Sequence, residues 1–561
     1  MTILFEDYFY NASSLAECKL PADMWSWSDD GRSAKTTYVG YYNSVFILPK
    51  VFIDSQGRPF GKDNVTIEDF VNTGKTLSEL LGETDAQTVS RLSFWIYLAI
   101  ARYAEKVQDT CILKSGDIQN VKSIGEYGCT TFIEVIQSLR KFNSDHQHLF
   151  TYIVKSNRSG KNKIDWTRTV GRTSPIMQDD EPVYLSFYNK QKKINYDEEI
   201  IVIFYSVLQY LKEKYFFEEQ LNLNFNLIPV HKIEEMIEDE SGTLLLNKVR
   251  HKYFTDDLVQ LWHLLYVFFE KAEKIANKGY IDEFVLARSF NNVFEHMVDQ
   301  LIGSKKLARL KKNKDNKIID HLYIDESLLR NGKTYFIADS KYYKEDRELE
   351  DASIYKQFTY ARNMLQYNLD EKHKGRKHHE SMRDEFLEGY SIIPNFFIRG
   401  SVLDSAGIYN YEDEKIEFDT KACDRRFTNI HFPNRLFDRD TIILHNFKIN
   451  FLYVLAKYVE GEDKAAKERI RRKFRTEMIR RYDGMYHFYR LTPLNGKTTE
   501  DIIDLNFRSL IGRAIRPDKD SVHLIFAWEK NAAQEDCVEY LKALRHIEYK
   551  EFTLAELNGL V

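Results

Sequence analysis

Two apolar segments that flank a short turn set the strongest limit on how this chain can fold. Residues 317–325 and 333–343 each have the pattern of a strand, and Asn331-Gly332 between them is a common signal for a tight hairpin turn. We therefore predict an antiparallel pair of strands. A helix is expected before the pair, beginning near Asp282, whose carboxylate can cap it, and running to about Ile302.

A second helix and a third strand are expected after this hairpin. The helical pattern runs from about Ala352 to Tyr367, and the apolar segment Gly389 to Arg399 follows a charged insert at 371–385. The resulting order is helix, strand, strand, helix, strand. This order predicts an α/β core in which a mixed sheet is flanked by helices.

The length of the chain requires more than this one unit. At 561 residues the protein is too long for a single compact core, and two to four domains are expected. Extended segments are predicted at 38–53 and 182–187, helices at 89–107, 130–142, 198–217 and 256–277, and an exposed loop or boundary at 155–163. We predict a mixed α+β N-terminal region at 1–155, a linker and helical region at 156–278, the α/β core at 279–455 and a helical C-terminal extension at 456–561.

The composition is typical of a folded chain that stays in the cytoplasm. Hydrophobic residues make up 43% and aromatic residues 14%, far above the content of disordered chains. The apolar runs are too short to cross a bilayer, and the first residues lack the pattern of a signal peptide. Five scattered cysteines, none in a C-x-x-C arrangement, argue against a disulfide framework and a structural zinc site.

Acidic residues interrupt both strands of the predicted hairpin. In the second strand, alternation places Asp339 and Lys341 on one face, two residues apart. In the first strand Asp320 stands among apolar residues, where an unpaired charge would be costly to bury. A metal ion shared by Asp320 and Asp339 would explain both carboxylates.

The two flanking helices supply further polar side chains. Glu295 lies in the helix before the hairpin, and the apolar positions of that helix would pack on the sheet and aim Glu295 at the strand ends. In the helix after the hairpin, Gln357 and Tyr360 are three residues apart and share one face. We therefore add Glu295 and Gln357 to the candidate site.

This set of side chains suits the hydrolysis of a phosphodiester bond. That reaction needs a Lewis acid, an activated water and a group that offsets charge on phosphorus. Mg²⁺ is small, hard and octahedral, so carboxylates from separate elements must converge on it. We predict a Mg²⁺ site, with Mn²⁺ as a possible substitute, held by Asp320, Asp339 and Glu295; Lys341 orients the attacking water and Gln357 helps to position it.

The same residues resemble a known family. The order Glu295, Asp320, Asp339-x-Lys341 and Gln357-x-x-Tyr360 resembles the PD-(D/E)xK nuclease superfamily, with Ile319 in place of its proline. A closer resemblance is to nuclease subunits of McrC and LlaJI type. It is carried by Phe-Glu at 294–295, Ile-Asp-His-Leu-Tyr at 319–323, Phe-Ile-Ala-Asp-Ser-Lys-Tyr-Tyr at 336–343, Asp-Trp-Thr-Arg-Thr at 165–169, Pro-Val-Tyr at 182–184, Asn-Arg-Leu-Phe-Asp-Arg-Asp at 434–440 and Ile-Asn-Phe-Leu at 449–452.

The resemblance implies a restriction endonuclease-like core and a function in DNA restriction. It leads us to expect a metal-dependent endonuclease that cuts double-stranded DNA together with a separate McrB-like AAA+ GTPase, on which the part before the nuclease would dock. This chain should then bind no nucleotide itself. A P-loop requires G-x-x-x-x-G-K-[ST], and residues 57–63, 332–334 and 496–498 each lack part of that pattern.

Three basic clusters are candidates for contact with DNA phosphates. The cluster beside the Glu295 helix comprises Lys305, Lys306, Arg309, Lys311 and Lys312, and Tyr360 is added to it as a DNA-contact candidate. Residues 372–377 suit a solvated loop, and the helix 464–481 suits either an exposed face or a protein contact. Trp166 is expected in a core. Two other functions stay open: a RecB-like repair nuclease, and a non-cutting scaffold subunit that assembles and stimulates the motor.

Overall fold

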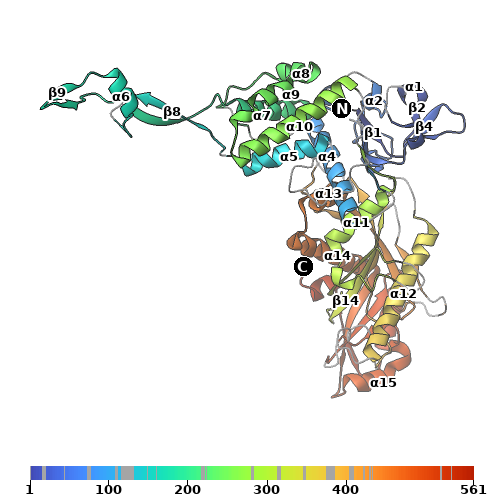
Figure 1. Ribbon diagram of the computed structural model, residues 1–561. Coiled ribbons are helices and arrows are strands. Elements are labelled where there is room, and N and C mark those ends of the chain that lie inside the picture. The colour runs from blue at the N-terminus through green and yellow to red at the C-terminus, as the bar shows by residue number, and fades with distance from the viewer. Residues whose placement is uncertain are drawn as a thin grey trace.

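The computed structural model of this protein describes an elongated body with a thin arm (Figure 1). It describes every residue except 1, 16–19, 43–44, 73–76, 108–111, 115–131, 148, 159–160, 216–220, 223, 279–283, 313–317, 331, 345–348, 374–383, 385, 403–409, 421–423, 429–430, 432–433, 518–520, 532–533 and 561. The predicted helix cap at Asp282, the turn residue Asn331 and the basic residues 374–377 lie outside the described residues.

The N-terminal sheet is assembled from distant parts of the chain. Its strand order is β1 (Thr2–Phe5), β6 (Val45–Leu48), β5 (Val39–Tyr42), β12 (Phe284–Ala287) and β7 (Ile112–Lys114), and helix α4 (Glu83–Lys106) packs on it. Strand β12 thus belongs to this sheet, although the sequence places it within the predicted 279–455 core. Gly40 at φ 137° allows the close approach of β12, because a Cβ there would lie 2.2 Å from the Val285 carbonyl oxygen.

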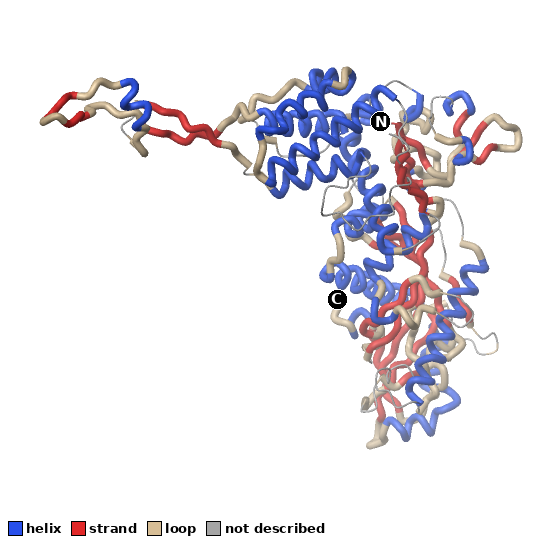
Figure 2. The backbone as a smooth tube through the Cα atoms, viewed as in Figure 1, coloured by secondary structure: helices blue, strands red, loops and turns tan. Residues whose placement is uncertain are grey.

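A helical layer and the arm follow. Five helices pack together in the layer: α5 (Phe132–Asp145), α7 (Glu199–Tyr215), α8 (Val230–Glu238), α9 (Ser241–Val249) and α10 (Asp256–Lys278). Between α5 and α7 the chain leaves this layer and returns, forming the arm (Figure 2). The arm contains β8 (Tyr152–Asn157) paired with β11 (Asn189–Ile194), helix α6 (Trp166–Arg172), and the hairpin of β9 (Ile176–Gln178) and β10 (Glu181–Val183).

Two predictions for the arm are wrong. Residues 155–157, expected in a loop, form part of strand β8, because they pair with β11 rather than marking a boundary. Trp166, expected in a core, keeps 54% of its surface exposed, since the arm projects away from every larger core.

The central sheet carries the candidate residues. Strands β14, β15 and β18 are parallel, and β13 and β16 pair antiparallel at its two edges. The order is β13 (His321–Glu326), β14 (Lys333–Lys341), β15 (Asn395–Ser401), β18 (Ile442–Asn450) and β16 (Ile416–Phe418), and β17 (Arg425–Phe427) also pairs with β18. This mixed sheet between helices confirms the predicted α/β class in its coarse form.

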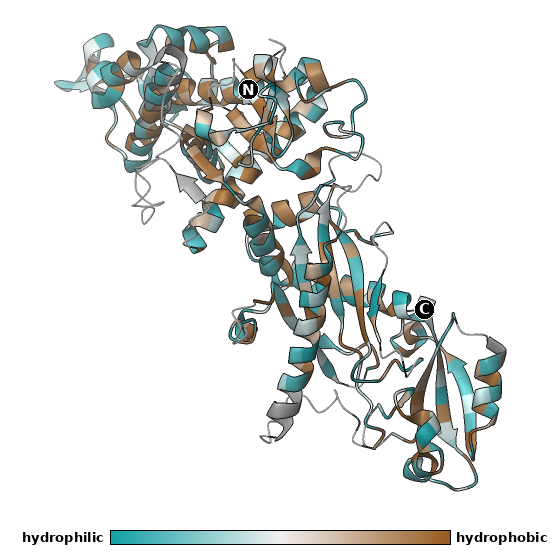
Figure 3. Cartoon of the chain, turned by 90° about the vertical axis from the view of Figure 1, so that its right-hand side faces the viewer, coloured by the Kyte–Doolittle hydropathy of each residue, from teal (hydrophilic) through white to brown (hydrophobic). Residues whose placement is uncertain are grey.

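Alternating side chains give the central sheet two apolar faces. Ile337 and Phe397 face helix α12 (Asp351–His373), where they pack with Phe358. Phe336 and Phe396 face the opposite core, which includes α11 (Phe290–Ile302), α13 (Phe451–Glu460) and α14 (Lys464–Met485). Figure 3 shows apolar residues gathered where helices meet sheets and polar residues on the outer surfaces. Because Asp339 and Lys341 continue the alternation of Ile337, they belong to the α12 side.

The predicted order of helix, strand, strand, helix and strand is confirmed, with shifted bounds. Helix α11 begins only at Phe290, because the residues just before it form β12. Strand β13 begins at His321, so Asp320 precedes the strand instead of interrupting it. Strand β15 begins at Asn395, later than the predicted Gly389.

The C-terminal extension is not simply helical, as the sequence predicted. After α14 the chain forms a further sheet, in the order β20 (Ala514–Ile515), β21 (Leu524–Glu529), β19 (Tyr486–Pro493) and β22 (Ile547–Phe552). Helices α15 (Thr499–Leu510) and α16 (Gln534–Lys542) contribute to its core, and α17 (Leu554–Leu557) packs back on α14. Both faces of β19 are buried, because Tyr486 and Phe488 pack in the larger core while Tyr489 and Leu491 pack in the core of this C-terminal sheet. Among the described helices, none is long and apolar enough to span a membrane.

Candidate active site

Asp339 is a buried acidic member of the candidate site. It lies near the end of β14, its side chain has no exposed surface, and neither carboxylate oxygen accepts a hydrogen bond of ordinary geometry from the described residues. Lys341 Nζ lies 2.7 Å from Asp339 Oδ1 as an ion-pair partner. A buried carboxylate with so few partners is costly unless another group compensates its charge.

Asp320 reaches the same point from the neighbouring strand. His321 pairs with Ala338 in the antiparallel register, which brings the preceding Asp320 beside Asp339. Burial, and then the negative charges of Asp339 and Glu295, raise the pKa of Asp320 well above its usual value. The two aspartates that the sequence predicted as a pair therefore lie together.

Glu295 approaches from helix α11. Helix α11 packs on both strands of the hairpin, β13 and β14. Burial and the charge of Asp339 raise the pKa of Glu295 to about 7, against the opposing charges of Lys341 and Lys356. The carboxyl groups of Glu295, Asp320 and Asp339 thus interact at the end of β14, which also carries Lys341.

Gln357 is fully buried on α12, which packs on β14. Its Nε2 donates a hydrogen bond of 2.8 Å to Asn395 Oδ1, while Oε1 has no hydrogen-bond partner among the described residues. Asn395 on β15 therefore orients the amide. The oxygen remains as a group that could accept a hydrogen bond from water.

Sequence reasoning missed Lys356, which lies next to Gln357 on α12. Its positive charge lowers the pKa of both Glu295 and Asp320, although burial and the other carboxylates outweigh it. No sequence pattern singles out Lys356, because a lysine beside the Gln-x-x-Tyr pattern is also typical of a solvated helix face.

A second missed feature is a set of hydrogen bonds that holds the start of β13. His321 is fully buried, with Nδ1 3.3 Å from Asp299 Oδ1 and Nε2 2.6 Å from Ser340 Oγ. Lys311 Nζ donates to Asp299 Oδ1 at 2.5 Å and to the Asp320 carbonyl oxygen at 2.6 Å. Burial opposes ionisation of Asp299, but these contacts lower its pKa to about 2.

The predicted DNA-contact cluster divides into two groups. Lys306, Arg309 and Lys312 are exposed, and Lys305 is exposed but pairs with Glu462. Lys311 is instead a structural residue, because Asp299 and Asp320 engage its amine. Tyr360 is buried in the core between α12 and the sheet and donates a hydrogen bond of 2.7 Å to the Ile318 carbonyl oxygen. Its complete burial contradicts the predicted DNA contact.

Arginine side chains of the basic helix α14 also bind neighbouring elements of the fold. Arg471 donates to the carbonyl oxygens of Ile302 and Gly303, which end helix α11. Arg475 donates to the carbonyl oxygens of Glu326 and Ser327 after β13. These bonds favour a structural role for this helix. The sequence left two readings open, an exposed face or a protein contact, and the bonds are contacts within the protein.

The strand that carries Asp339 and Lys341 is tied to the N-terminal sheet directly after the site. The hydroxyl of Tyr342 donates a hydrogen bond to the buried carboxylate of Glu6, and Lys50 N donates to the same hydroxyl at 3.2 Å. Lys344 Nζ donates to the Asp7 carbonyl oxygen at 2.5 Å. A shift of the N-terminal sheet would therefore move the end of β14, where the site lies.

Replacing Glu295 with glutamine should stabilise the metal-free protein at alkaline pH. The folded-state pKa of about 7 exceeds the ordinary 4.5. The contribution of Glu295 to the free energy of unfolding is therefore fully present below about pH 4.5 and is lost as the pH rises through 7. At about 1.4 kcal/mol per pKa unit, the variant should gain up to about 3 kcal/mol at high pH. Urea unfolding of both proteins with a chelator, at low and high pH, measures this difference. A gain of the same size at both pH values would contradict it.

The comparisons with known proteins place this α/β chain, with its cluster of carboxyl groups and lysine, in a family. The LlaJI restriction endonuclease family matches residues 100–402, just over half of the 561 residues. The chain belongs to this family, and the matched segment contains Glu295, Asp320, Asp339, Lys341 and Gln357.

The other comparisons add little. No curated protein matches the chain. Among solved structures, the chain is similar to one described as a refined half-complex from a tetradecameric assembly of Thermococcus gammatolerans McrB AAA+ hexamers with bound McrC. The two are 13% identical, the alignment covers 85% of this chain and 99% of that chain, and the TM-score of 0.27 is too low to define a shared fold.

Proposed function

We propose that this protein is the Mg²⁺-dependent DNA-cleaving subunit of a McrBC/LlaJI-like restriction system, with a PD-(D/E)xK nuclease core. The observation that carries this proposal is the convergence of Asp320, Asp339 and Glu295 beside Lys341 at one strand end. Membership of the LlaJI family supports it independently.

The residues present fit a magnesium ion. The buried oxygens of Asp339 accept no ordinary hydrogen bond from the described residues, and burial together with the neighbouring carboxylates raises the pKa of Asp320 and of Glu295. In the described part of the chain, no group of three or more His, Cys, Asp or Glu side chains is arranged to hold a metal as it stands. That is compatible with Mg²⁺, which takes only one or two carboxylates directly and retains water. Asp320 and Asp339 would hold it, with Glu295 assisting.

The chain's own side chains can perform the remaining chemistry. A bound Mg²⁺ ion supplies Lewis-acid stabilisation of charge on the phosphate. Lys341 Nζ, paired with Asp339 in the structure, orients the attacking water and offsets charge on the phosphate oxygens. Glu295 assists from α11, where its carboxylate can accept a hydrogen bond from that water. The Gln357 oxygen can accept a hydrogen bond that fixes the water, since Asn395 holds the amide.

The arm is the surface that we propose for a McrB-like AAA+ GTPase partner. Its apolar side chains are exposed: Leu185 by 76%, Met177 by 61% and Trp166 by 54%. Apolar residues grouped on a projecting element are typical of a protein interface. The position of the arm within the family-matched segment supports the same partner, because the family resemblance implies a separate motor.

The proposed function is tested by incubating the full chain with plasmid DNA, Mg²⁺ and GTP, with and without a McrB-like AAA+ GTPase. We expect cleavage that needs Mg²⁺ and is stimulated by the motor. Full cleavage without any motor would favour a repair nuclease instead. DNA left intact under every condition, with the motor bound and its GTPase stimulated, would identify a non-cutting scaffold.

A further inference from the structure

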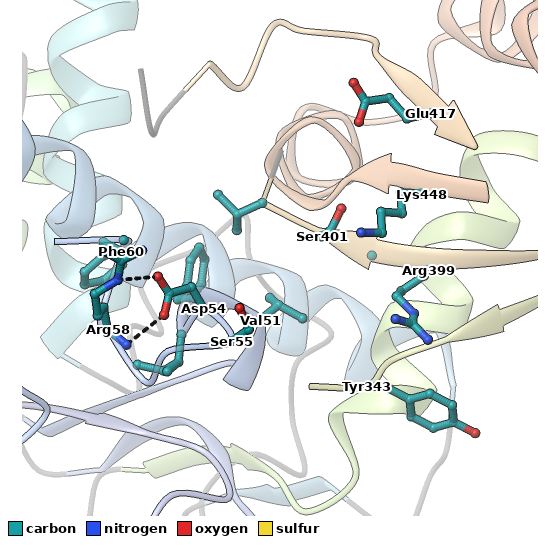
Figure 4. A pocket seen from close by; sticks show the side chains of 15 residues that line it. Val51, Asp54, Ser55, Arg58, Phe60, Tyr343, Arg399, Ser401, Glu417 and Lys448 are labelled. Carbon is teal, nitrogen blue, oxygen red and sulfur yellow. Dashed lines mark hydrogen bonds and ion pairs between the residues drawn. The ribbon is translucent and has the colours of Figure 1, made fainter. Parts of the chain in front are cut away.

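Figure 4 shows the side chains that line a cavity of about 430 Å³, among them Tyr343, two residues after Lys341. Its floor is formed by the ends of three strands of the central sheet, and its wall by the segment after β6 of the N-terminal sheet. The volume falls in the range of small-molecule sites. The lining comprises Val51, Phe52, Ile53, Asp54, Ser55, Arg58, Phe60, Gly61, Tyr343, Arg399, Gly400, Ser401, Val402, Glu417 and Lys448.

The cavity floor continues a row of basic residues that starts at the active site. Lys341 on β14 is in register with Arg399 on β15, and Arg399 is in register with Lys448 on β18. Residues in register on neighbouring strands share a face, and the strands lie about 4.8 Å apart. The row therefore leads from the lysine of the site directly into the cavity, over a span of about 10 Å.

Two cations of the cavity floor contact the same carboxylate. Arg399 is buried, with 6% of its surface exposed, and its Nη1 lies 3.5 Å from Asp419 Oδ2. Lys448 Nζ lies 3.6 Å from the other oxygen of Asp419, so the Asp419 carboxylate pairs with both cations.

The acidic side chains in the lining have cations of their own. Asp54 Oδ2 accepts a hydrogen bond of 2.7 Å from Arg58 Nε, and Glu417 pairs with Lys415. An anion in the cavity could therefore be held by Arg399 and Lys448 without meeting an unpaired carboxylate.

The remaining lining fits the other parts of a nucleotide. Ser401 Oγ is buried and has no hydrogen-bond partner among the described residues, and Figure 4 shows Ser401 beside Lys448. It can donate to a phosphate or sugar oxygen. Val51, Phe52 and Val402 provide apolar surface on which a sugar or base can pack. A cavity of this size is also much larger than a single phosphate requires.

We propose that this cavity holds one nucleotide of the DNA strand that is cut, with its phosphate at Lys448 and Arg399. The site would fix the strand a few phosphates from the scissile one at Lys341, because successive phosphates advance about 3.4 Å along each strand. The inference rests on the proposed nuclease function and assigns a new DNA subsite to it.

The test compares Lys448→Gln with Lys542→Gln in the full-length protein. Lys542 is a suitable control, since it is exposed on α16 and does not line the cavity. Binding of a duplex oligonucleotide is measured as a function of salt concentration. Lys448→Gln should reduce the slope of log affinity against log salt by about 0.7 to 0.9, the value for one lost phosphate contact, and Lys542→Gln should leave it unchanged. Ser401→Leu, which fills the cavity and keeps the charges, should weaken DNA binding as well.

Each outcome separates this subsite from the proposed function. If wild type cuts DNA and Lys448→Gln keeps the wild-type slope, the subsite is wrong and the nuclease function stands. If wild type neither binds nor cuts DNA, the nuclease function fails first. If a free deoxynucleoside monophosphate binds wild type and not Lys448→Gln, while DNA binding is the same in both, the cavity is a free-nucleotide site and the inference is overturned.

Discussion

Replacing Asp339 with asparagine is expected to reduce DNA cleavage at saturating Mg²⁺ by at least about 1000-fold. The substitution removes the buried charge that would hold the metal, and a loss of about 4 kcal/mol of transition-state stabilisation corresponds to this factor. The fold should survive, because the side chain keeps its shape and a buried carboxylate without ordinary hydrogen bonds is removed. Single-turnover cleavage measures the rate, and thermal unfolding measures the stability.

A suitable control is Asp325→Asn, which changes the same kind of side chain on the same hairpin. Asp325 pairs with Thr334 at the far end of β13, away from the carboxyl cluster. This variant should cut at the wild-type rate. Cleavage by Asp339→Asn within tenfold of wild type would show that Asp339 is not a metal ligand in the reaction.

Introducing aspartate at Leu185 and Met177 on the arm should abolish stimulation by the AAA+ partner. If these exposed apolar side chains become buried at the interface, two unpaired carboxylates would be forced into an apolar contact. A cost of about 3 kcal/mol would weaken partner binding more than 100-fold. The affinity is measured by calorimetry and the stimulation by cleavage assays with GTP.

Val522→Asp provides the matched control for the arm, because Val522 is 72% exposed but lies in the C-terminal region. It should bind the motor like wild type. Equal stimulation of the arm variant and wild type would show that the arm is not part of the interface. The active site proposal would be unaffected.

The candidate site was predictable because its residues lie in a short stretch with strong local patterns. The apolar segments around Asn331-Gly332 fixed the hairpin, and alternation along β14 placed Asp339 and Lys341 on one face. The antiparallel register then brought Asp320 beside Asp339. These relations depend on residues close in sequence, which is why one sequence was sufficient.

Features that depend on distant pairing were not predictable. Strand β12 leaves the predicted core to join β5, about 240 residues earlier, and no local pattern indicates this partner. The cavity draws its wall from residues 51–61 and its floor from 343–448, so it exists only in the folded chain. Trp166 has the composition of a core residue, but its exposure depends on the path of the arm.

Calorimetric titration of Mg²⁺ or Mn²⁺ into wild type and Asp339→Asn tests the central proposal most directly. At about neutral pH the wild type should bind the ion and release protons, because Asp320 and Glu295 have raised pKa values and must ionise. Asp339→Asn should lose most of this affinity. Equal binding by both proteins, or binding without proton release, would contradict a metal site built from these carboxylates.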